Sequence, residues 1–368
     1  MKVGIVTFHR ANNYGASLQT WALQKVLRDL KVDSGVINYH PEIIDRLYDP
    51  MMCRRGLSRQ IKRFQQFLRN RDSLKRYNKF IHFLNKNINM IGNFHTYSEL
   101  EKAKLGLDAY IVGSDQVWND THTGGYDPAF FLQFAEQGKK RISYAASIGR
   151  DYFNPRFKEQ FRQGLLRFDA ISVREPSLLG AVKELVDMKV TVVLDPTLLL
   201  EREDYEEIKG KSRIKEKYIL IYMIEKNDQL MALANRISIA LGIPVIQRRP
   251  VGSLRNELPP FYTADAGDFL GLMESAEYVI TNSFHGTVFS ILYERPFVSM
   301  LHSDTGSRTA DLLKGLDLQS HILYDIKDFR DFGMFQIKNP EKLRSNIREQ
   351  KKESLQFLKE SLGLNETK

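Results

Sequence analysis

Short apolar runs alternate with amphipathic stretches along the first forty residues. Residues 3–8 (VGIVTF) are apolar and rich in β-branched side chains, which is typical of a buried parallel strand. Residues 12–15 (NNYG) have turn-forming chemistry, and apolar positions from Leu18 to Leu30 then recur at helical spacing. Residues 35–39 predict a second strand. The order strand, turn, helix, strand indicates a βαβ unit.

The same alternation continues along most of the chain. It predicts further strands at residues 108–113, 141–146, 168–173, 190–194, 218–223, 244–247, 278–281 and 296–300. Helical spacing occurs at residues 228–241, 269–276, 285–293, 307–315 and 341–362. Elements that alternate in this way predict parallel sheets with helices on both faces, so the fold class is doubly wound α/β.

The length of the chain predicts two domains, because 368 residues exceed what one hydrophobic core comfortably serves. We place an N-terminal domain at residues 1–200, a C-terminal domain at 201–335 and a C-terminal helix at 336–368. Ligands of open α/β sheets bind beyond the carboxyl ends of the strands. In two such domains these ends can face each other across a cleft, so the residues that follow strands are the candidates for chemistry.

The charge of the chain is concentrated in one helical insert of the N-terminal domain, at about residues 51–92. From Arg54 to Lys86 there are eleven Lys or Arg and one acid, Asp72, so this stretch has a net charge of +10. The rest of the chain has a net charge of −1, which gives the total of +9. The stretch is also amphipathic. A solvated or packed helical face explains it, and so does contact with an anionic membrane surface or a diphosphate-linked acceptor. Nucleic acid is disfavoured, because no nucleic-acid-binding motif is present.

Several protein classes are disfavoured by missing features. No apolar run approaches the roughly 20 residues that cross a bilayer, and the apolar N-terminal run is too short for a secretory signal. The single cysteine, Cys53, cannot form an internal disulfide, which favours a reducing, cytoplasmic location. The H-E-x-x-H motif, Cys-His clusters and EF-hand loops do not occur, so we predict no metal site.

The strongest candidate site is the junction of a strand and a helix at residues 281–290 (TNSFHGTVFS). Asn282 and Ser283 can cap the helix, whose backbone N–H groups can hold an anion. His285 is then a proton carrier beside an anion site. In the alternative interpretation, Asn282 and Ser283 are only caps and His285 is a structural histidine.

Three further strand ends carry candidate residues. Asp115 and Trp118 follow the strand at 108–113, where a carboxylate could orient or deprotonate a hydroxyl and an indole could stack on a sugar. Arg174 could bind a phosphate or carboxylate, or pair with Glu175. Arg308 lies on the first turn of a helix, where a cation opposes the helix dipole and so suggests a ligand.

The loop after the first strand could bind a sugar through its amide and aromatic side chains. Its residues are Asn12, Asn13, Tyr14 and Gly15. It lacks the glycine patterns of dinucleotide and phosphate loops, and a plain tight turn explains it equally well.

Taken together, six motifs in order resemble the polysaccharide pyruvyl transferase family. They are residues 7–16 (TFHRANNYGA), 111–118 (IVGSDQVW), 144–149 (YAASIG), 172–177 (SVREPS), 194–197 (LDPT) and 282–286 (NSFHG). The resemblance implies a GT-B-like fold with two Rossmann-like domains. It also implies transfer of the pyruvyl group of phosphoenolpyruvate, as donor substrate, onto a sugar as a ketal. No other cofactor is implied.

The resemblance also suggests roles for individual residues. His285 and Arg174 match functional positions of the family, with Asp115 as a third catalytic candidate. Asn282, Ser283, Gly286 and Arg308 would bind the donor, and Asn12, Asn13, Tyr14, Gly15 and Trp118 the acceptor. Many members of the family have an arginine two residues before the histidine, whereas this chain has Ser283 at that position. Anion binding then relies more on Arg174, Arg308 or the backbone.

Two other functions remain open from the sequence. A GT-B glycosyltransferase that uses a nucleotide sugar would need an acidic residue in the C-terminal domain, and Glu274 and Glu277 are the candidates. A glycan- or lipid-binding protein without turnover is the other. The expected acceptor of the pyruvyl transferase is a sugar or a lipid-linked oligosaccharide, with peripheral membrane contact through residues 54–86.

Overall fold

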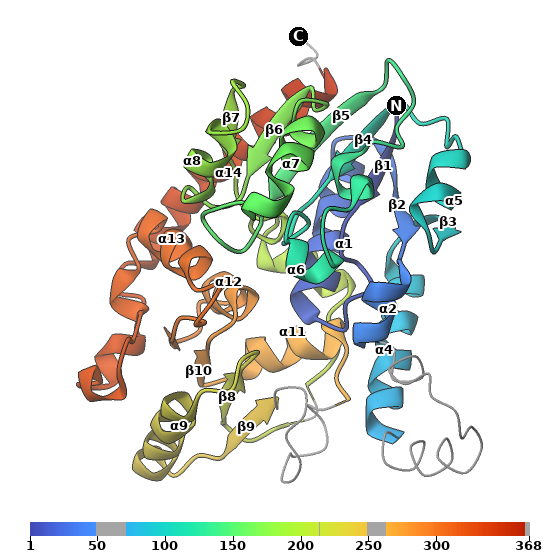
Figure 1. The fold of residues 1–368 in the computed structure, drawn as a ribbon. Helices are drawn as coiled ribbons and strands as arrows, with labels where there is room; N and C mark the ends of the chain where they lie inside the picture. The colour runs from blue at the N-terminus through green and yellow to red at the C-terminus, as the bar shows by residue number, and fades with distance from the viewer. Residues whose placement is uncertain (49–70, 213, 249–262, 365–368) are drawn as a thin grey trace. The chain divides into compact units, whose positions relative to one another are not determined.

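The computed structural model describes residues 1–48, 71–212, 214–248 and 263–364, and the chain falls into two α/β units (Figure 1). Unit 1 consists of Met1–Leu199 and Gln350–Lys368, and unit 2 of Leu200–Glu349. The division after Leu199 lies beside the expected one after residue 200. The C-terminal helix is shared between the units, whereas the sequence analysis set residues 336–368 apart.

Unit 1 contains a seven-stranded parallel sheet in the order β3-β2-β1-β4-β5-β6-β7. Its strands are β1 (Lys2–Val6), β2 (Asp33–Tyr39), β3 (Met90–Phe94), β4 (Ala109–Val112), β5 (Lys140–Ala146), β6 (Ala170–Val173) and β7 (Val190–Val192). Val3 pairs with Ser34 on one side and with Ala109 on the other. The strand order reverses between β1 and β4, the kind of switch point at which open α/β sheets bind ligands.

The helices of unit 1 connect these strands. They are α1 (Tyr14–Asp29), α2 (Glu42–Tyr48), α4 (Arg71–Asn87), α5 (Tyr97–Lys102), α6 (Asp120–Thr123), α7 (Lys158–Leu165) and α8 (Leu178–Lys183). Short 3-10 turns occur at η1 (Pro128–Phe131), η2 (Pro155–Phe157) and η3 (Pro196–Leu199). The core contains many aromatic side chains, including Trp118, Phe130 and Phe131.

The predicted basic helical insert ends earlier in the chain than residue 92, its expected end. Residues 54–70 lie outside the described residues. Helix α4 follows, but Met90–Phe94 forms the edge strand β3, so the insert does not extend to residue 92. Strand β3 was not predicted, because only Met90, Ile91 and Phe94 are apolar in it. Within α4, Arg76 is buried and its guanidinium lies over the rings of Tyr14 and Phe80, so one of the basic residues is structural.

Unit 2 contains a four-stranded parallel sheet in the order β11-β10-β8-β9. The strands are β8 (Ile219–Tyr222), β9 (Val245–Arg248), β10 (Tyr278–Thr281) and β11 (Phe297–Ser299). The helices are α9 (Asp228–Leu241), α11 (Ala266–Ser275), α12 (Phe284–Leu292), α13 (Ser307–Gly315) and the shared α14 (Pro340–Leu362). The described part of the unit also contains the 3-10 turns η4 (Arg202–Glu207), η5 (Gln319–His321), η6 (Ile326–Asp328) and η7 (Phe332–Phe335).

Helix α14 returns to the sheet of unit 1, where its red ribbon runs behind the green strands (Figure 1). Ser354 Oγ accepts a hydrogen bond from the backbone N–H of Leu194 at 2.9 Å, and the ring of Phe357 lies 6.4 Å from that of Tyr144. These contacts explain why the second half of α14 belongs to unit 1.

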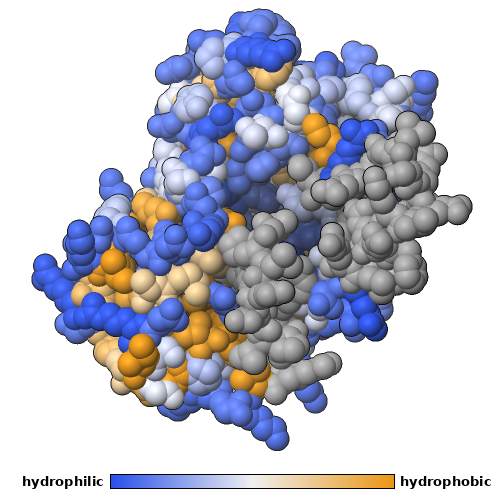
Figure 2. Space-filling view, turned by 60° about the horizontal axis from the view of Figure 1, so that its bottom comes forward, coloured by the Kyte–Doolittle hydropathy of each residue, from blue (hydrophilic) through white to orange (hydrophobic). Residues whose placement is uncertain are grey.

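The surface is mostly polar on the face that Figure 2 shows, where apolar residues form separate groups among hydrophilic ones. Individual apolar side chains such as Ile239 and Tyr324 are exposed. Among the described helices, none combines the length and the apolar composition that crossing a membrane requires.

Candidate functional site

Strand β10 runs directly into helix α12 in unit 2, and this junction is built by its own hydroxyl groups. Thr281 Oγ1 donates to the carbonyl of Tyr222 at 2.5 Å and accepts from the backbone N–H of Ser283 at 3.0 Å. Ser283 has extended dihedral angles, and its Oγ accepts from the N–H of Gly286 at 3.3 Å. Ser283 is therefore the N-cap of α12, which explains a small hydroxyl residue at this position.

Gly286 allows the helix to approach the strand closely. A Cβ atom at this position would lie 2.3 Å from Thr281 Oγ1 and 2.9 Å from Tyr222 Cδ1. No side chain fits there unless Thr281 or Tyr222 moves. Gly286 thus brings the positive end of the helix dipole to the carboxyl edge of the sheet, which favours an anion at that edge.

Asn282 fastens two strand-end loops to each other. Its Oδ1 accepts from the backbone N–H of Ile224 at 2.8 Å, and its Nδ2 donates to the carbonyl of Glu225 at 2.7 Å. Ile224 and Glu225 follow β8, so Asn282 positions the loop after β8 beside the loop after β10. Both polar atoms of its amide are used in this way, and its role is to shape the site.

His285, Phe284 and Arg308 lie together at this edge. His285 is 6 % exposed, and its ring packs edge-to-face against that of Phe284 at 5.1 Å. The guanidinium carbon of Arg308 lies 5.8 Å from the centre of the same Phe284 ring. Arg308 donates to the carbonyl of Thr305 at 3.2 Å and to its hydroxyl at 3.0 Å. The predicted proton carrier and one predicted anion ligand therefore occur in one place.

Glu225, His302 and Ser303 also lie at this edge and were not predicted from the sequence. The Glu225 carboxylate accepts from the backbone N–H of Ser303 at 2.8 Å and from its hydroxyl. Burial alone would raise the pKa of Glu225, but the bonds from Ser303 outweigh it and lower the pKa, so this carboxylate stays ionised. The signal was present, since Glu225 and His302 each stand three residues after a strand.

His302 is held as a neutral imidazole. Burial lowers its pKa, Arg308 lowers it further, and the attraction of Glu225 only partly offsets them. Its Nδ1 accepts the backbone N–H groups of Asp304 and Thr305 at 3.1 and 3.2 Å. Nδ1 also lies 3.7 Å from Glu225 Oε2, but it cannot donate to a carboxylate while it accepts these two bonds. The proton of His302 is therefore on Nε2.

In unit 1, the charge of Arg174 faces carboxylates, so its contacts lend no support to the predicted role in ligand binding. Its side chain is 2 % exposed, its Nε donates to Glu175 at 2.8 Å and its Nη1 to Asp195 at 2.9 Å. Asp115 Oδ1 lies 4.0 Å from Nη2. Burial alone would lower the pKa of Arg174, but the carboxylates outweigh it and raise the pKa. The alternative of an ion pair with Glu175 is present in the structure.

The carboxylates around Arg174 belong to a buried polar network. Asp195 is buried and accepts from the backbone N–H of Thr197 at 3.0 Å and from the hydroxyl of Ser114 at 3.0 Å. The Ser114 backbone N–H donates to Gln19 of α1 at 3.2 Å, and the Gln19 amide donates to Thr7 at 2.9 Å. This network joins the ends of β1, β4, β6 and β7, so it closes this part of the sheet edge.

Asp115 lies at the carboxyl end of β4 with a left-handed φ of 76°. Its carbonyl accepts from the backbone N–H of Ser147 at 3.0 Å, and its side chain is 15 % exposed. Gly113, two residues earlier, has a φ of 118°, and a Cβ there would lie 2.1 Å from the carbonyl oxygen of Tyr144. Only glycine fits at that position, and the backbone it permits leaves the Asp115 carboxylate partly open to solvent.

Two residues predicted to contact an acceptor sugar are buried, so that interpretation is wrong for them. Trp118 is 1 % exposed, stacks on Phe131 at 5.8 Å and donates from its indole to the carbonyl of Phe130. Tyr14 is fully buried and stacks on Phe80 at 5.4 Å. Neither ring has a face left for a sugar.

The rest of that loop shapes the start of α1. Asn13 is the N-cap of α1 and accepts from the backbone N–H of Gly15, which is buried. Asn12 is half-buried and donates to the carbonyl of Tyr48 at 2.8 Å. The tight-turn interpretation therefore accounts for these contacts.

A family model described as polysaccharide pyruvyl transferase matches residues 13–304. This range includes Asp115, Arg174 and the β10–α12 junction with His285. The chain belongs to the polysaccharide pyruvyl transferase family. It is thus a transferase of a family that acts on polysaccharides, which confirms the resemblance and implies a sugar acceptor. No curated protein matches the sequence significantly.

Solved structures with a similar fold match nearly the whole chain. A putative UDP-N-acetylglucosamine 2-epimerase from Listeria monocytogenes has 13 % identity and a TM-score of 0.51, covering 98 % of this chain and 89 % of its own. The UDP-GlcNAc 2-epimerase from Neisseria meningitidis has 13 % identity and a TM-score of 0.47, covering 98 % and 100 %. At such identities the likeness concerns the fold, and the two parallel sheets with their helices confirm the predicted α/β fold class.

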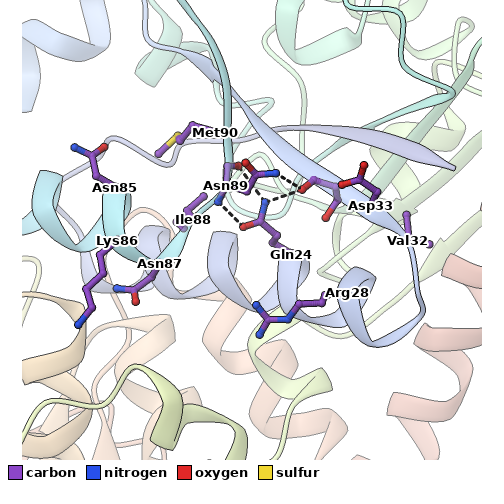
Figure 3. A pocket seen from close by; sticks show the side chains of 11 residues that line it. Gln24, Arg28, Val32, Asp33, Asn85, Lys86, Asn87, Ile88, Asn89 and Met90 are labelled. Carbon is purple, nitrogen blue, oxygen red and sulfur yellow. Dashed lines mark hydrogen bonds between the residues drawn. The ribbon is translucent and has the colours of Figure 1, made fainter.

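A cavity of about 770 Å³ lies in unit 1 (Figure 3). Asp33 and Met90, the first residues of β2 and β3, line it together with Gln24 and Asn89. Gln24 donates to the carbonyls of Ser34 and Asn89 and accepts from the Asn89 backbone N–H. The cavity is therefore at the amino ends of the strands, the edge that open α/β sheets do not use for ligands.

Proposed function

We propose that the chain transfers the pyruvyl group of phosphoenolpyruvate to two hydroxyls of a sugar as a cyclic ketal. Family membership supports transfer to a polysaccharide. The observation that carries the donor assignment is the grouping of Arg308, His285 and the N-terminus of α12 at one sheet edge. A phosphate and a carboxylate on a small donor require such a cation and helix end.

The proposed reaction requires proton transfers at the donor carbon, at both sugar hydroxyls and at the departing phosphate. A general acid protonates the methylene carbon of the donor, so positive charge develops at C2 and a sugar hydroxyl attacks there. The C2–O bond to phosphate breaks, and a second hydroxyl closes the ketal. The two sugar hydroxyls lose two protons. One proton converts the methylene group of the donor to a methyl group, and the second leaves on hydrogen phosphate. Water must be excluded while C2 is electrophilic.

His285 is the proton carrier in this proposal. It is buried beside Phe284, where bulk water has little access. Arg308 would hold the anionic part of the donor and stabilise the phosphate as it departs. Asn282, Ser283 and Gly286 act through the backbone, because they fix the helix end and the neighbouring loop.

Asp115 remains the proposed base for the attacking hydroxyl. It is a carboxylate at a strand end with part of its side chain exposed. The acceptor is proposed to be a polysaccharide or a lipid-linked repeat unit. Asn12 and Asn13 are the acceptor-side candidates that keep some exposure.

The nucleotide-sugar alternative gains no support from its two candidate glutamates. Glu274 pairs with Lys209 and lies 3.8 Å from Arg202. Glu277 pairs with Lys217 at 3.2 Å and precedes β10, so it stands at the amino end of that strand. Neither is placed to receive a ribose at the carboxyl edge.

Phosphate release tests the proposal. The wild-type chain is mixed with phosphoenolpyruvate and a panel of sugar acceptors that includes a β-galactoside. We expect release that depends on the acceptor, is lost in His285→Ala and is retained in His82→Ala, an exposed histidine of α4. Consumption of a nucleotide sugar without phosphoenolpyruvate use would instead favour a glycosyltransferase. Binding of glycan without any turnover would favour a binding protein.

A further inference from the structure

Two histidines directly follow neighbouring strands in unit 1 and have no part in the proposed function. His40 follows β2, which ends at Tyr39, and His95 follows β3, which ends at Phe94. The backbone N–H of His40 donates to the carbonyl of Phe94 at 2.9 Å, so the parallel pairing holds the two strand ends together. Both imidazoles therefore lie at the carboxyl edge of the sheet, where α/β folds bind ligands.

Asp45 of helix α2 completes a cluster of three metal-binding side chains. One donor atom from each of His40, Asp45 and His95 lies within 4.8 Å of the others. His40 Nδ1 is 2.7 Å from Asp45 Oδ2, and the centres of the two imidazole rings are 4.3 Å apart. The three residues come from three elements, so their approach is a property of the fold.

Asn93 connects the two imidazoles. Its Oδ1 lies 2.8 Å from His40 Nε2, and its Nδ2 lies 3.1 Å from His95 Nε2. His40 is buried and Asp45 half-buried, whereas His95 is exposed. Two ligands are thus held in place and the third can rotate toward them.

We propose that His40, His95 and Asp45 bind a divalent cation of the zinc type. Two imidazole nitrogens and one carboxylate oxygen suit Zn²⁺ and similar borderline cations, whereas Mg²⁺ and Ca²⁺ prefer oxygen ligands alone. Zinc takes four ligands with nitrogen and oxygen distances of about 2.0–2.2 Å, so a water would complete three protein ligands. The cation replaces the hydrogen bond between His40 and Asp45.

The proposed site would fasten α2 to the edge of the sheet. Asp45 belongs to α2, and the two histidines belong to the ends of β2 and β3. Sequence motifs do not reveal this site, because His95 is far along the chain from His40 and Asp45 and reaches them only through the pairing of β3 with β2. The inference stands whether or not the proposed transferase activity is correct.

Calorimetric titration with Zn²⁺ tests this proposal on the full chain after treatment with a chelator that is then removed. We expect one cation per chain. His95→Ala should weaken binding by about tenfold or more, because one of three protein ligands is lost, and Asp45→Asn should also weaken it. His95 is exposed, so its replacement leaves the fold intact, which circular dichroism checks. Titration with Co²⁺ should give visible absorption bands that the same variants lose.

His82→Ala is the matched control. His82 is an exposed imidazole of α4 in the same unit and lies outside the cluster, so its loss should leave Zn²⁺ affinity unchanged. Equal affinity in the wild type and His95→Ala would overturn the proposal, because binding would then occur elsewhere. Absence of binding to the wild type would overturn it as well.

Discussion

A buried arginine lies at the carboxyl edge of the sheet in each unit, Arg174 in unit 1 and Arg308 in unit 2, and these two arginines have different partners. Arg174 of unit 1 has Glu175, Asp195 and Asp115 as neighbours. Arg308 of unit 2 donates to the carbonyl and hydroxyl of Thr305 and lies over Phe284 beside His285. In the sequence the two arginines look alike, because Arg174 directly follows a strand and Arg308 lies in the first turn of a helix. Their partners decide which one holds the fold and which one can serve a ligand.

The cost of removing each arginine follows from these partners. A buried charge whose partner is removed is left in a medium of low dielectric constant, which is strongly unfavourable. Arg174→Ala leaves Glu175 and Asp195 without their cation. Arg308→Ala removes its hydrogen bonds to Thr305 and its cation–π contact with Phe284, and each of these is worth less than a buried ion pair.

Arg174→Ala should therefore have the largest effect on stability, lowering the free energy of unfolding by about 3–5 kcal/mol. The measurement is urea unfolding followed by tryptophan fluorescence. The chain has two tryptophans, Trp21 and Trp118, and both are buried in unit 1, so this signal reports unit 1 alone. Arg308→Ala is the matched control and should leave the fluorescence transition nearly unchanged. An equal shift in both variants would show that the contrast between the two edges is wrong.

His285→Ala should reduce turnover about 10²–10⁴-fold, because the step that protonates the donor loses its proton carrier. The check is phosphate release at saturating phosphoenolpyruvate, with circular dichroism to verify the fold. Asp115→Asn, the matched change in unit 1, should also slow turnover if that carboxylate accepts the hydroxyl proton. Turnover retained in His285→Ala would remove His285 from the mechanism.

Unit 1 should lose stability in mild acid through His9. Burial, the largest cause, lowers the pKa of His9 to about 4, from about 6.5 in the unfolded chain. Between these values the unfolded state binds a proton that the folded state does not, so the free energy of unfolding falls as the pH falls. The loss should be about 2 kcal/mol between pH 6.5 and pH 5.

Tryptophan fluorescence again isolates unit 1 in this experiment. His302 and His321, whose pKa values are also lowered, belong to unit 2. In buffer with a chelator, His9→Asn should flatten the dependence of unit 1 stability on pH, and His82→Asn should not. An unchanged slope in His9→Asn would mean that His9 is protonated in the folded protein.

The smallest expected effects come from the two helix caps. Ser283→Ala and Asn13→Ala each remove a side chain that accepts a backbone N–H at the start of α12 or α1. Each should cost about 1 kcal/mol of stability. Asn13→Ala should shift the tryptophan transition and Ser283→Ala should not, because α12 belongs to unit 2. The reverse pattern would contradict the division into units.

Much of the fold followed from hydrophobic periodicity, because buried parallel strands are short apolar runs between amphipathic helices. The edge strand β3 did not, since Gly92 and Asn93 interrupt its apolar pattern and its pairing with β2 comes from tertiary structure. The β10–α12 junction was predicted because its capping hydroxyl and glycine are local signals. Their effect is visible in the contacts of Ser283 and Gly286.

Side-chain environment was harder to predict. Trp118 and Tyr14 have the chemistry of a sugar platform, but their burial depends on partners such as Phe131 and Phe80, which lie elsewhere in the chain. Arg174 was assigned to a ligand because Asp195, its partner from 21 residues away, could not be foreseen. The cluster of His40, Asp45 and His95 was missed for the same reason.

The central claim is that the edge of unit 2, through Arg308, holds the anionic donor. Direct calorimetric titration with phosphoenolpyruvate tests it for the wild type, for Arg308→Ala and for Lys75→Ala, which removes an exposed cation from α4. We expect Arg308→Ala to raise the Kd about tenfold or more, equivalent to about 1.4 kcal/mol, and Lys75→Ala to leave it unchanged. Equal affinity in the wild type and Arg308→Ala, or no binding to the wild type, would contradict the account.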